Sequence, residues 1–448
     1  MSQDFRLDNI GLINRDKKIS FKFNGKSYFG YEGDTLASAL IANGVHLVGR
    51  SFKYHRPRGF FGSGVDEPYA IVQLYRNKET DPNVRATEQE LFEGLEATSV
   101  NCWPNVNFDI GAINNFLNKF FPAGFYYKTF MWPKSFWYKI YEPFIRKAAG
   151  FGVASIKHDQ EKYEHKYEYC DLLITGSGPS GLASAYAAAK NGARVILAED
   201  KPRFGGSLLT SEANIGNQSG KEWADKIITE LKEMPNVIVK NRSQVFGYYD
   251  HNMVVMSERI NDHLPKSKKY SPKQRLWYIR AKEVVISSGS IERPLVFGNN
   301  DTPGVLLTSA AKEYLKVYGV LVGKKPLIFT NNDSAYETAI EFKKNGINPL
   351  VLDTRINPKS EIIDEAKSLN INIKFSYVVI AAKGYKKVKS AEIAKISEDK
   401  KDLGQIENIN CDCICVSGFW TPTIHLASQS GNKTKFNKEI DAFIPGQS

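Results

Sequence analysis

Three glycines in a strand-to-helix turn form the part of this sequence whose spacing best suits a chemical role. Gly176, Gly178 and Gly181 have the spacing G-x-G-x-x-G and directly follow the apolar run Asp171–Thr175. In such a turn the first glycine permits a sharp bend, the second lets the backbone approach a pyrophosphate, and the third lets helix and strand pack closely. Free N–H groups at the start of the following helix then bind phosphate. The motif predicts a dinucleotide site.

An acidic residue completes the motif. The Ala-rich run Leu182–Asn191 favours a helix, Val195–Ala198 favours a second strand, and Glu199 follows that strand. A carboxylate in this position accepts hydrogen bonds from a ribose 2′-OH and repels a 2′-phosphate. We therefore expect NAD or FAD and not NADP.

The loops near this acid contain further candidates. Gly205 and Gly206 are typical of flavoprotein folds with two dinucleotide domains. Lys201 and Arg203 are near enough to contact phosphate or ribose, or they are solvated loop charges. A later strand ends at Ser288-Gly289, where such folds bring the chain back to the nucleotide.

The composition is that of an ordinary globular protein. The 448 residues are 42% hydrophobic and 24% charged, which suits two to four domains. The net charge is +11, but the basic residues are scattered apart from surface runs such as 386–401, so nucleic acid is not expected as a partner. The N-terminal sequence lacks the apolar region of a signal peptide, and no apolar run is long enough to span a membrane. We expect a cytoplasmic protein without membrane contact.

The five cysteines do not indicate a disulfide framework or a metal centre. Cys411, Cys413 and Cys415 alternate, which on a strand places them in a row on one face and not around a tetrahedral ion. We interpret them as small core side chains and assign no metal ligand. Because the sequence offers no nucleophile–base pair and no paired carboxylates in a suitable context, we also assign no catalytic residue.

Residues 1–84 are predicted to form a ferredoxin-like β-grasp module. Asn24-Gly25 favours a two-residue hairpin turn, Asp34 is placed to cap a helix that runs to Asn43, and Tyr69–Tyr75 alternates as a returning strand. Such modules hold a [2Fe–2S] cluster in the loop after the helix. Here that loop, VHLVGRSFKYHRPRGFFGSGVDEP, contains no cysteine, so we expect no iron–sulfur cluster.

The same loop is basic and aromatic. This composition favours an interface with a partner subunit or another domain over single-stranded nucleic acid. Its basic residues are Arg50, Lys53, His55, Arg56 and Arg58.

An aromatic-rich stretch follows over residues 85–168. Pro122, Pro133 and Pro143 prevent it from forming one helix. It suits either an interface or a packed connector between domains.

The rest of the chain is expected to contain two nucleotide-binding folds, one inserted into the other. The first covers residues 169–320, a degenerate second fold is inserted over 321–390, and residues 391–448 return to the first. The phosphate turn of the second fold, TNNDSAYE, has no glycine, so a second dinucleotide is not expected to bind there in the standard manner. The strand Cys411–Val416, which leads to Gly418, is expected to rejoin the first sheet.

Several long segments together resemble the α-subunit family of heterotetrameric sarcosine oxidases. They occur in the same order over essentially the whole chain: GYEGDTLASALIANGVHLVGRSFKYHRPRG, FPAGFYYKTFMWPKSFWYKIYEPFIRKAAG, GSGPSGL, SIERPLVFGNNDTPGV, FTNNDSAYE and VSGFWTPTIHLASQSG. The resemblance implies an α/β fold with two dinucleotide-binding domains of the FAD/NAD-linked reductase type, preceded by a ferredoxin-like domain.

The resemblance also implies cofactors, partners and a reaction. NAD would bind in this chain, FAD and FMN would belong to a partner β subunit, and smaller γ and δ subunits would complete the complex. Such a complex oxidatively demethylates sarcosine to glycine, forms hydrogen peroxide and passes the one-carbon unit to tetrahydrofolate. By position, the residues expected at the NAD site besides the three hinge glycines are Ser180, Glu199, Asp200, Lys201, Gly206, Ser207, Val245, Gly418, Ala427, Asn432 and Thr434.

Family α subunits continue into an aminomethyltransferase-like domain that binds folate, and this sequence stops where that domain would begin. The folate-binding half is therefore expected outside this sequence, either because this chain is truncated or because that half is a separate polypeptide. Three functions stay open: an NAD-binding sarcosine oxidase subunit that is inactive alone, a non-catalytic scaffold subunit, and a subunit of an FAD-dependent amine, proline or opine dehydrogenase.

Overall fold

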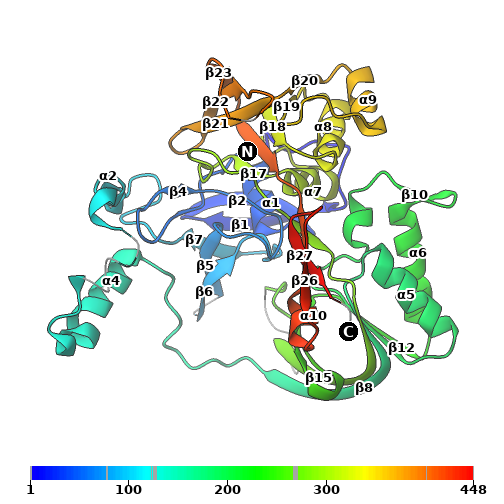
Figure 1. Cartoon of the computed structure of the whole chain (residues 1–448). Coiled ribbons are helices and arrows are strands. Elements are labelled where there is room, and N and C mark those ends of the chain that lie inside the picture. The colour runs from blue at the N-terminus through cyan, green and yellow to red at the C-terminus, as the bar shows by residue number, and fades with distance from the viewer. Residues whose placement is uncertain are drawn as a thin grey trace. The chain divides into compact units, whose positions relative to one another are not determined.

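The computed structural model describes residues 3–76, 79–122, 124, 129–265, 271–399 and 401–446. The chain divides into two compact units, each built from two separate stretches (Figure 1). Unit 1 comprises Met1–Asp159 and Pro294–Gly418, and unit 2 comprises Gln160–Arg293 and Phe419–Ser448. The inserted part therefore begins at Pro294 and not at residue 321, and it ends at Gly418 and not at residue 390.

Unit 1 begins with the expected β-grasp module. Asn24 and Gly25 have φ angles of 51° and 75°, which is the left-handed backbone that a tight hairpin turn requires. The sheet has the strand order β2-β1-β7-β5-β6. Its elements are β1 (Asn14–Phe23), β2 (Lys26–Glu32), α1 (Leu36–Ala42), β5 (Ile71–Arg76), β6 (Glu79–Arg85) and β7 (Leu95–Ser99), with a short pair β3 (Gly49–Arg50) and β4 (Pro57–Arg58) in the loop after α1.

The cap of α1 lies one residue later than expected. Thr35 Oγ1 accepts a hydrogen bond from the Ser38 amide at 3.1 Å, and Ser38 Oγ accepts one from the Thr35 amide at 3.0 Å. Asp34 instead pairs with Arg6 at 2.7 Å, in a buried salt bridge. Both the Asp34 carboxylate and the Thr35 hydroxyl are suited to cap a helix. Because Asp34 pairs with Arg6, Thr35 is the residue that caps α1.

The aromatic-rich stretch exposes many of its rings. It contains the short helices α2 (Ile113–Phe116) and α4 (Glu142–Ala149), and residues 123 and 125–128 lie outside the described part. Exposure of these rings favours the interface interpretation over a packed connector, and that interface stays a prediction. The most exposed aromatic residues described in this stretch are Trp103, Phe108, Phe116, Phe120, Trp132, Tyr138, Phe144 and Tyr167.

The inserted part of unit 1 has a five-stranded parallel sheet in the order β17-β24-β18-β19-β20. Its elements are β17 (Val305–Leu307), α7 (Thr308–Tyr318), β18 (Pro326–Thr330), α8 (Ser334–Lys344), β19 (Leu350–Asp353), α9 (Glu361–Ser368), β20 (Asn372–Phe375) and β24 (Cys413–Ser417). A three-stranded sheet of β21 (Tyr377–Gly384), β22 (Val388–Lys395) and β23 (Glu407–Asn410) packs beside it.

The strand that contains two of the clustered cysteines does not rejoin the first sheet, so that expectation is wrong. β24 lies between β17 and β18 and is buried along its whole length. A fully apolar strand is suited to a central place in either parallel sheet, and the sequence pattern cannot distinguish them. Cys411, Cys413 and Cys415 are all buried, as expected of core side chains, and burial raises the pKa of the Cys411 thiol to about 12.

The β-grasp module packs directly on the inserted part of unit 1. Arg6 donates to the Tyr318 carbonyl at 2.8 Å, and the Tyr314 hydroxyl donates to the Gly62 carbonyl at 2.9 Å. A side chain at Gly319 would place its Cβ 2.2 Å from the Ile10 carbonyl oxygen. The module therefore shares one compact unit with the inserted fold.

Unit 2 is built on a six-stranded sheet in the order β12-β9-β8-β15-β14-β13. Helices α5 and α6 lie side by side and pack on the sheet against Ile174 and Leu197 (Figure 1). A second core cluster joins Met256 of β14 and Trp277 of β15 to Leu173 and Ile196 within the same sheet. The elements are β8 (Tyr163–Thr175), α5 (Pro179–Lys190), β9 (Val195–Ala198), α6 (Gly220–Glu233), β12 (Val237–Lys240), β13 (Ser243–Tyr249), β14 (Met253–Arg259) and β15 (Gln274–Ile286).

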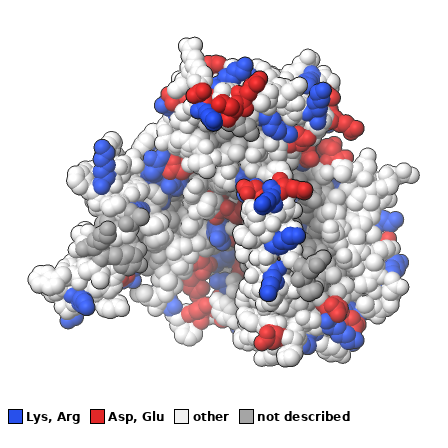
Figure 2. Space-filling model, viewed as in Figure 1, with Lys and Arg blue, Asp and Glu red and all other residues white. Residues whose placement is uncertain are grey.

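The C-terminal stretch completes unit 2. β25 (Trp420–Pro422) pairs with β16 (Ser290–Glu292), and α10 (His425–Gln429) is followed by the hairpin of β26 (Thr434–Asn437) and β27 (Ala442–Pro445). Within the described ranges, no helix is long and apolar enough to cross a bilayer. On the face drawn in Figure 2, basic and acidic side chains are intermixed, which agrees with scattered surface charge.

Candidate dinucleotide site

The glycine hinge joins β8 to α5 in unit 2. Gly176 has a φ angle of +94°, and a Cβ there would lie 2.5 Å from the Ser287 carbonyl oxygen. A Cβ at Gly181 would lie 1.9 Å from the Gly176 carbonyl oxygen. Both positions therefore exclude a side chain. A Cβ at Gly178 would meet no described atom within 4 Å, so the backbone there is open to an approaching group.

The start of α5 is suited to an anion. Gly178 is the N-cap and no side chain among the described residues caps the helix, so the positive end of the helix dipole is left to solvent or ligand. Ser180 is exposed in the first turn. Gly206 packs against Gly178 at the start of α5, because a Cβ at position 206 would lie 2.9 Å from Gly178 Cα. The exposed Ser207 follows Gly206 in the chain.

Glu199 points at the hinge. Its Oε2 accepts hydrogen bonds from the Ser177 amide at 2.9 Å and from Ser177 Oγ at 2.5 Å. Its Oε1 accepts one from the Lys201 amide at 3.0 Å. The side chain is 6% exposed, so the acid that was predicted from spacing alone is held beside the phosphate turn by three hydrogen bonds.

The environment of Glu199 raises its pKa to about 7. Burial is the largest cause and the neighbouring Asp200 adds to it, whereas hydrogen bonds from Ser177 and from the Lys201 amide act in the opposite direction. Asp200 and Lys201 are themselves tied to the next turn of the chain: Arg259 donates to the Asp200 carbonyl at 3.0 Å, and the Arg242 amide donates to the Lys201 carbonyl at 3.1 Å.

The structure brings some of the remaining predicted residues towards this site. The Ser243 amide donates to the Glu199 carbonyl at 2.7 Å, so β13, which contains Val245, begins beside the acid. Ala427 is buried in α10, which contacts β13 through a hydrogen bond from the Tyr248 amide to Gln429 at 3.0 Å.

Three other predicted residues have no contact to the hinge among the described interactions. Asn432 follows α10, Thr434 starts β26, and Gly418 belongs to unit 1. Their place at the cofactor stays a prediction.

Sequence reasoning missed one residue of the site. Ser177, the x of the first G-x-G, bonds Glu199, and its only sequence signal is a hydroxyl where the motif accepts any residue. The turn after β15 lies at the hinge through Ser287, next to the Ser288-Gly289 end where the sequence predicted the chain's return to the nucleotide. Ser288 Oγ donates to the Thr423 carbonyl at 3.0 Å, and the Thr423 amide donates to the Gly289 carbonyl at 2.9 Å.

In the inserted fold, the acid that corresponds to Glu199 already accepts hydrogen bonds from side chains of its own domain. Asp353 ends β19, is fully buried and accepts hydrogen bonds from the Tyr336 hydroxyl at 2.8 Å and from Arg355. In the glycine-free turn, Asn332 bonds Ser417 Oγ at 3.0 Å. These internal contacts agree with the expectation that no second dinucleotide binds in the standard manner, which stays a prediction.

The basic loop of the β-grasp module is largely paired within unit 1. Arg56 bonds Asp301 at 2.6 Å, and Arg58 pairs with the same carboxylate. His55 Nδ1 lies 2.7 Å from Asp109 Oδ2, and both side chains are buried. These charges pair within their own chain, and the role of the loop as an interface with a partner subunit or another domain stays a prediction.

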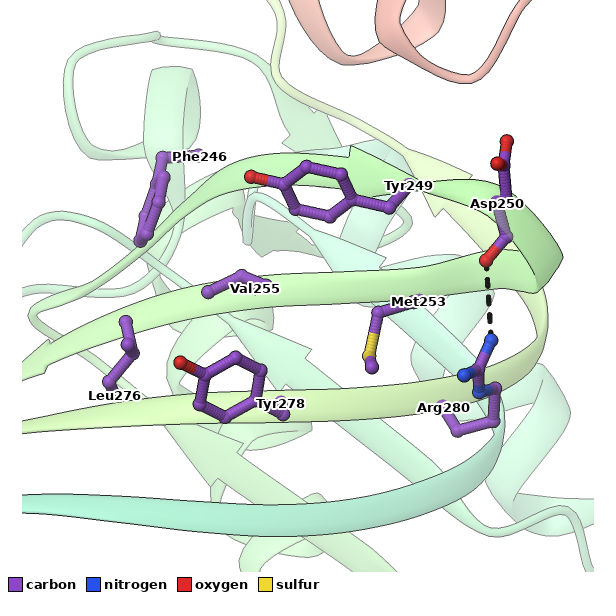
Figure 3. Close-up of a pocket in the computed structure, with 8 residues that line it drawn as sticks. All are labelled: Phe246, Tyr249, Asp250, Met253, Val255, Leu276, Tyr278 and Arg280. Carbon is purple, nitrogen blue, oxygen red and sulfur yellow. Dashed lines mark hydrogen bonds between the residues drawn. The ribbon is translucent and has the colours of Figure 1, made fainter.

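Unit 2 also contains a pocket of about 520 Å³ on the outer face of β13, β14 and β15 (Figure 3). Residues alternate along these strands: Val255 and Tyr278 line the pocket, whereas Met256 and Trp277 point into the core. Arg280 donates to the Asp250 carbonyl at 3.2 Å at one end. The pocket lining contains no hinge residue, and we assign it no part in the dinucleotide site.

Comparison with known proteins identifies the relatives of this chain. It is 45% identical over 444 residues to the sarcosine oxidase subunit alpha of Rhizobium meliloti (strain 1021), covering 99% of this chain and 44% of that protein. The chain is a homologue of sarcosine oxidase α subunits. The subunit from Corynebacterium sp. (strain U-96) is 31% identical over 440 residues, with 97% of this chain and 40% of that protein covered. This sarcosine oxidase α-subunit homologue thus spans less than half the length of these relatives, which are oxidoreductase subunits.

The fold of the homologue agrees with the expected class. Residues 171–253, which contain the hinge and Glu199, match a family described as FAD dependent oxidoreductase. The crystal structure of L-proline dehydrogenase from P. horikoshii superposes on the whole chain with a TM-score of 0.63 at 19% identity, covering 68% of that protein. The predicted α/β fold of the FAD/NAD-linked reductase type is confirmed.

One expectation for the homologue is contradicted. Residues 16–102 match a family described as 2Fe-2S iron-sulfur cluster binding domain. The prediction that this module has no iron–sulfur cluster is therefore wrong, because the family to which the module belongs is one that binds such a cluster. The prediction considered only thiolates in one loop, whereas the match extends over the whole framework of hairpin, helix and returning strands.

The donor atoms of this module can be examined directly. Residues 16–102 contain one cysteine, Cys102, and burial raises the pKa of its thiol to about 11. Within the described ranges, no group of three or more His, Cys, Asp or Glu side chains is arranged to hold a metal. These residues do not fit a four-thiolate ligand set, so the chemistry proposed below does not pass through a cluster.

Proposed function

We propose that this chain is the NAD-binding subunit of a sarcosine oxidase-type complex. In that complex the N-methyl group of sarcosine loses two electrons, which pass to O2 and form hydrogen peroxide. Water then cleaves the resulting imine into glycine and a one-carbon unit at the oxidation level of formaldehyde. The flavin chemistry belongs to a partner subunit, and the isolated chain is inactive. The observation that carries the NAD assignment is the placement of the Glu199 carboxylate on the glycine hinge, 2.9 Å from the Ser177 amide.

The residues of the hinge fit a dinucleotide in three ways. The open backbone at Gly178 and the uncapped start of α5 would hold the pyrophosphate. Glu199 would accept a hydrogen bond from a ribose hydroxyl, and its carboxylate would repel a 2′-phosphate. Val245, on the strand that begins beside Glu199, would flank the adenine. Bound NAD supplies a hydride acceptor or donor.

The proposal is tested by releasing and identifying the nucleotide. The full chain is purified without added nucleotide, denatured, and the supernatant analysed by mass spectrometry. We expect NAD at about one equivalent per chain. Recovery of no dinucleotide, together with no binding of added NAD in calorimetry, would contradict the proposal.

FAD in this same site is a second candidate, favoured by the match of residues 171–253 to FAD dependent oxidoreductases. In that case the chain would be a subunit of an FAD-dependent amine, proline or opine dehydrogenase. The same release experiment separates the two, because an FAD-loaded chain is yellow and absorbs near 450 nm whereas an NAD-loaded chain does not. Co-purification with partner chains would then show which complex the subunit enters.

A further inference from the structure

We propose that Ser177 is a positioning residue that orients the Glu199 carboxylate and keeps one of its oxygens available for the ribose hydroxyl of the dinucleotide. This inference rests on the proposed function and adds to it a residue that the spacing of the motif leaves unspecified. The steps below start from the hydrogen bonds of Ser177 itself.

Ser177 donates both of its hydrogen bonds to the same oxygen of the Glu199 carboxylate and none to the other oxygen. Its amide and its hydroxyl both donate to Oε2, at 2.9 Å and 2.5 Å. Oε1 accepts one hydrogen bond, from the Lys201 amide at 3.0 Å. A carboxylate oxygen can accept two hydrogen bonds, so the two bonds from Ser177 saturate Oε2, and Oε1 is the oxygen with fewer N–H and O–H donors among the described hydrogen bonds. The Asp200 side chain also lies within hydrogen-bonding reach of the Glu199 carboxyl group. The ribose hydroxyl is therefore assigned to Oε1.

The direction of the Ser177 hydroxyl is determined by a third group. The Gly205 amide donates to Ser177 Oγ at 3.1 Å, so Oγ is an acceptor on that side and its own hydrogen points to Glu199. Gly206, the next residue, packs against Gly178 at the phosphate turn. Ser177 is fully buried, so it links the phosphate turn, the acid and the Gly205 loop without competition from water.

The hydroxyl also acts on the charge of the acid. Burial and Asp200 both raise the pKa of Glu199, and the hydrogen bond from Ser177 lowers it. A ribose hydroxyl donates best to the ionised carboxylate, so affinity should fall as Glu199 takes up a proton. Removing the Ser177 hydroxyl should raise the pKa of Glu199, so the loss of NAD affinity on acidification should begin at a higher pH. The charged residues in the segments packed around Glu199 are Asp200, Lys201, Lys240, Arg242 and Arg259.

The test compares the wild-type chain with Ser177→Ala, both freed of bound nucleotide, using NAD as the ligand in calorimetry between pH 6 and pH 9. We expect Ser177→Ala to weaken binding about tenfold near pH 7 and much less at pH 9, because one unit of pKa corresponds to a factor of ten. The matched control is Ser184→Ala, a half-buried serine on α5, which should follow the wild-type curve. An equal loss at every pH, or no loss, would overturn the inference.

A second measurement does not need the nucleotide. Carboxyl 13C NMR of the nucleotide-free chain, with Glu199→Gln used to assign the signal, follows the titration of Glu199. We expect the midpoint to lie higher in Ser177→Ala than in the wild type. If wild type binds NAD but neither the midpoint nor the pH profile changes, only the role of Ser177 fails. If wild type binds no dinucleotide at any pH, both the proposed function and this inference fail.

Discussion

The hydroxyl of Tyr336 lies 2.8 Å from Oδ2 of Asp353, so the acid that ends strand β19 is already bonded by its own domain. Glu199 has the same place in the first nucleotide fold, but its Oε1 accepts a hydrogen bond from a backbone group, the Lys201 amide, beside an open glycine turn. The two folds therefore have the same strand-end acid with different availability to a ligand.

We predict from this contrast that the chain binds one dinucleotide. Tyr336→Phe should not create a second site, because Arg355 still bonds Asp353 at 2.8 Å and the turn before α8 has no glycine. Titration calorimetry with NAD should give a stoichiometry near one for both proteins. A second equivalent in the variant would show that the tyrosine alone closes the site.

The hinge glycines should separate binding from stability. Gly178→Ala places a methyl in open space at an extended backbone, so the melting temperature should stay within about 2 °C while NAD affinity falls more than tenfold. Gly181→Ala instead drives a Cβ against the Gly176 carbonyl and should cost about 1–3 kcal/mol of unfolding free energy. Thermal melts and calorimetry on both variants measure this difference. Equal stability of the two variants would contradict it.

Glu199→Ala decides whether the nucleotide matters for turnover. Loss of the carboxylate should weaken NAD binding by about 1.5–3 kcal/mol, the usual contribution of a charged hydrogen bond. The assembled complex with this variant is then assayed for sarcosine-dependent peroxide formation. Lower turnover with NAD lost supports a working cofactor. Normal turnover with NAD lost would make this chain a scaffold.

His55 should stabilise unit 1 through its buried pair. His55 lies 2.7 Å from Asp109 Oδ2 and 3.2 Å from the Ala148 carbonyl at the end of α4, so it ties the loop after α1 to the aromatic stretch. His55→Ala leaves Asp109 buried with a partner missing and should cost about 3 kcal/mol in urea unfolding. His158→Ala, an exposed histidine of the same unit, serves as control and should change little.

Acid should destabilise unit 1 through two carboxylates. Burial raises the pKa of Asp109 and of Asp301, but hydrogen bonds and the charges of His55, Arg50, Arg56 and Arg58 outweigh it, so both pKa values are lowered. The folded state therefore binds these protons less tightly than the unfolded state, and its stability is present above about pH 4 and lost as pH falls below it. Urea unfolding between pH 2.5 and 6 measures the slope, which Asp301→Asn should reduce.

Glu199 should act in the opposite sense on unit 2. Its pKa is raised to about 7, mainly by burial, so the stability it contributes is fully present below about pH 4 and is lost as pH rises through 7. The difference amounts to roughly 3 kcal/mol at most. Glu199→Gln should flatten this dependence between pH 5 and 8. An unchanged slope in that variant would contradict the raised pKa.

The sequence by itself determined the local part of this protein. The glycine hinge, the acid eighteen residues after its last glycine and the Asn24-Gly25 hairpin are short-range patterns. In each of them, the local backbone geometry requires the residue types that the sequence contains. Steric exclusion at Gly176 and Gly181 and positive φ at Gly25 act within a few residues of chain, so spacing and residue type were sufficient to predict them.

Tertiary structure alone decided what depends on distant partners. The apolar pattern of β24 is compatible with either sheet. Asp34 is also suited to cap α1, but in the structure its carboxylate forms a salt bridge with Arg6. The hydrogen bond between Ser177 and Glu199 joins residues 22 apart, and that between Tyr336 and Asp353 joins residues 17 apart. Such contacts depend on how strands and turns pack in space, and the identity of a single residue does not specify them.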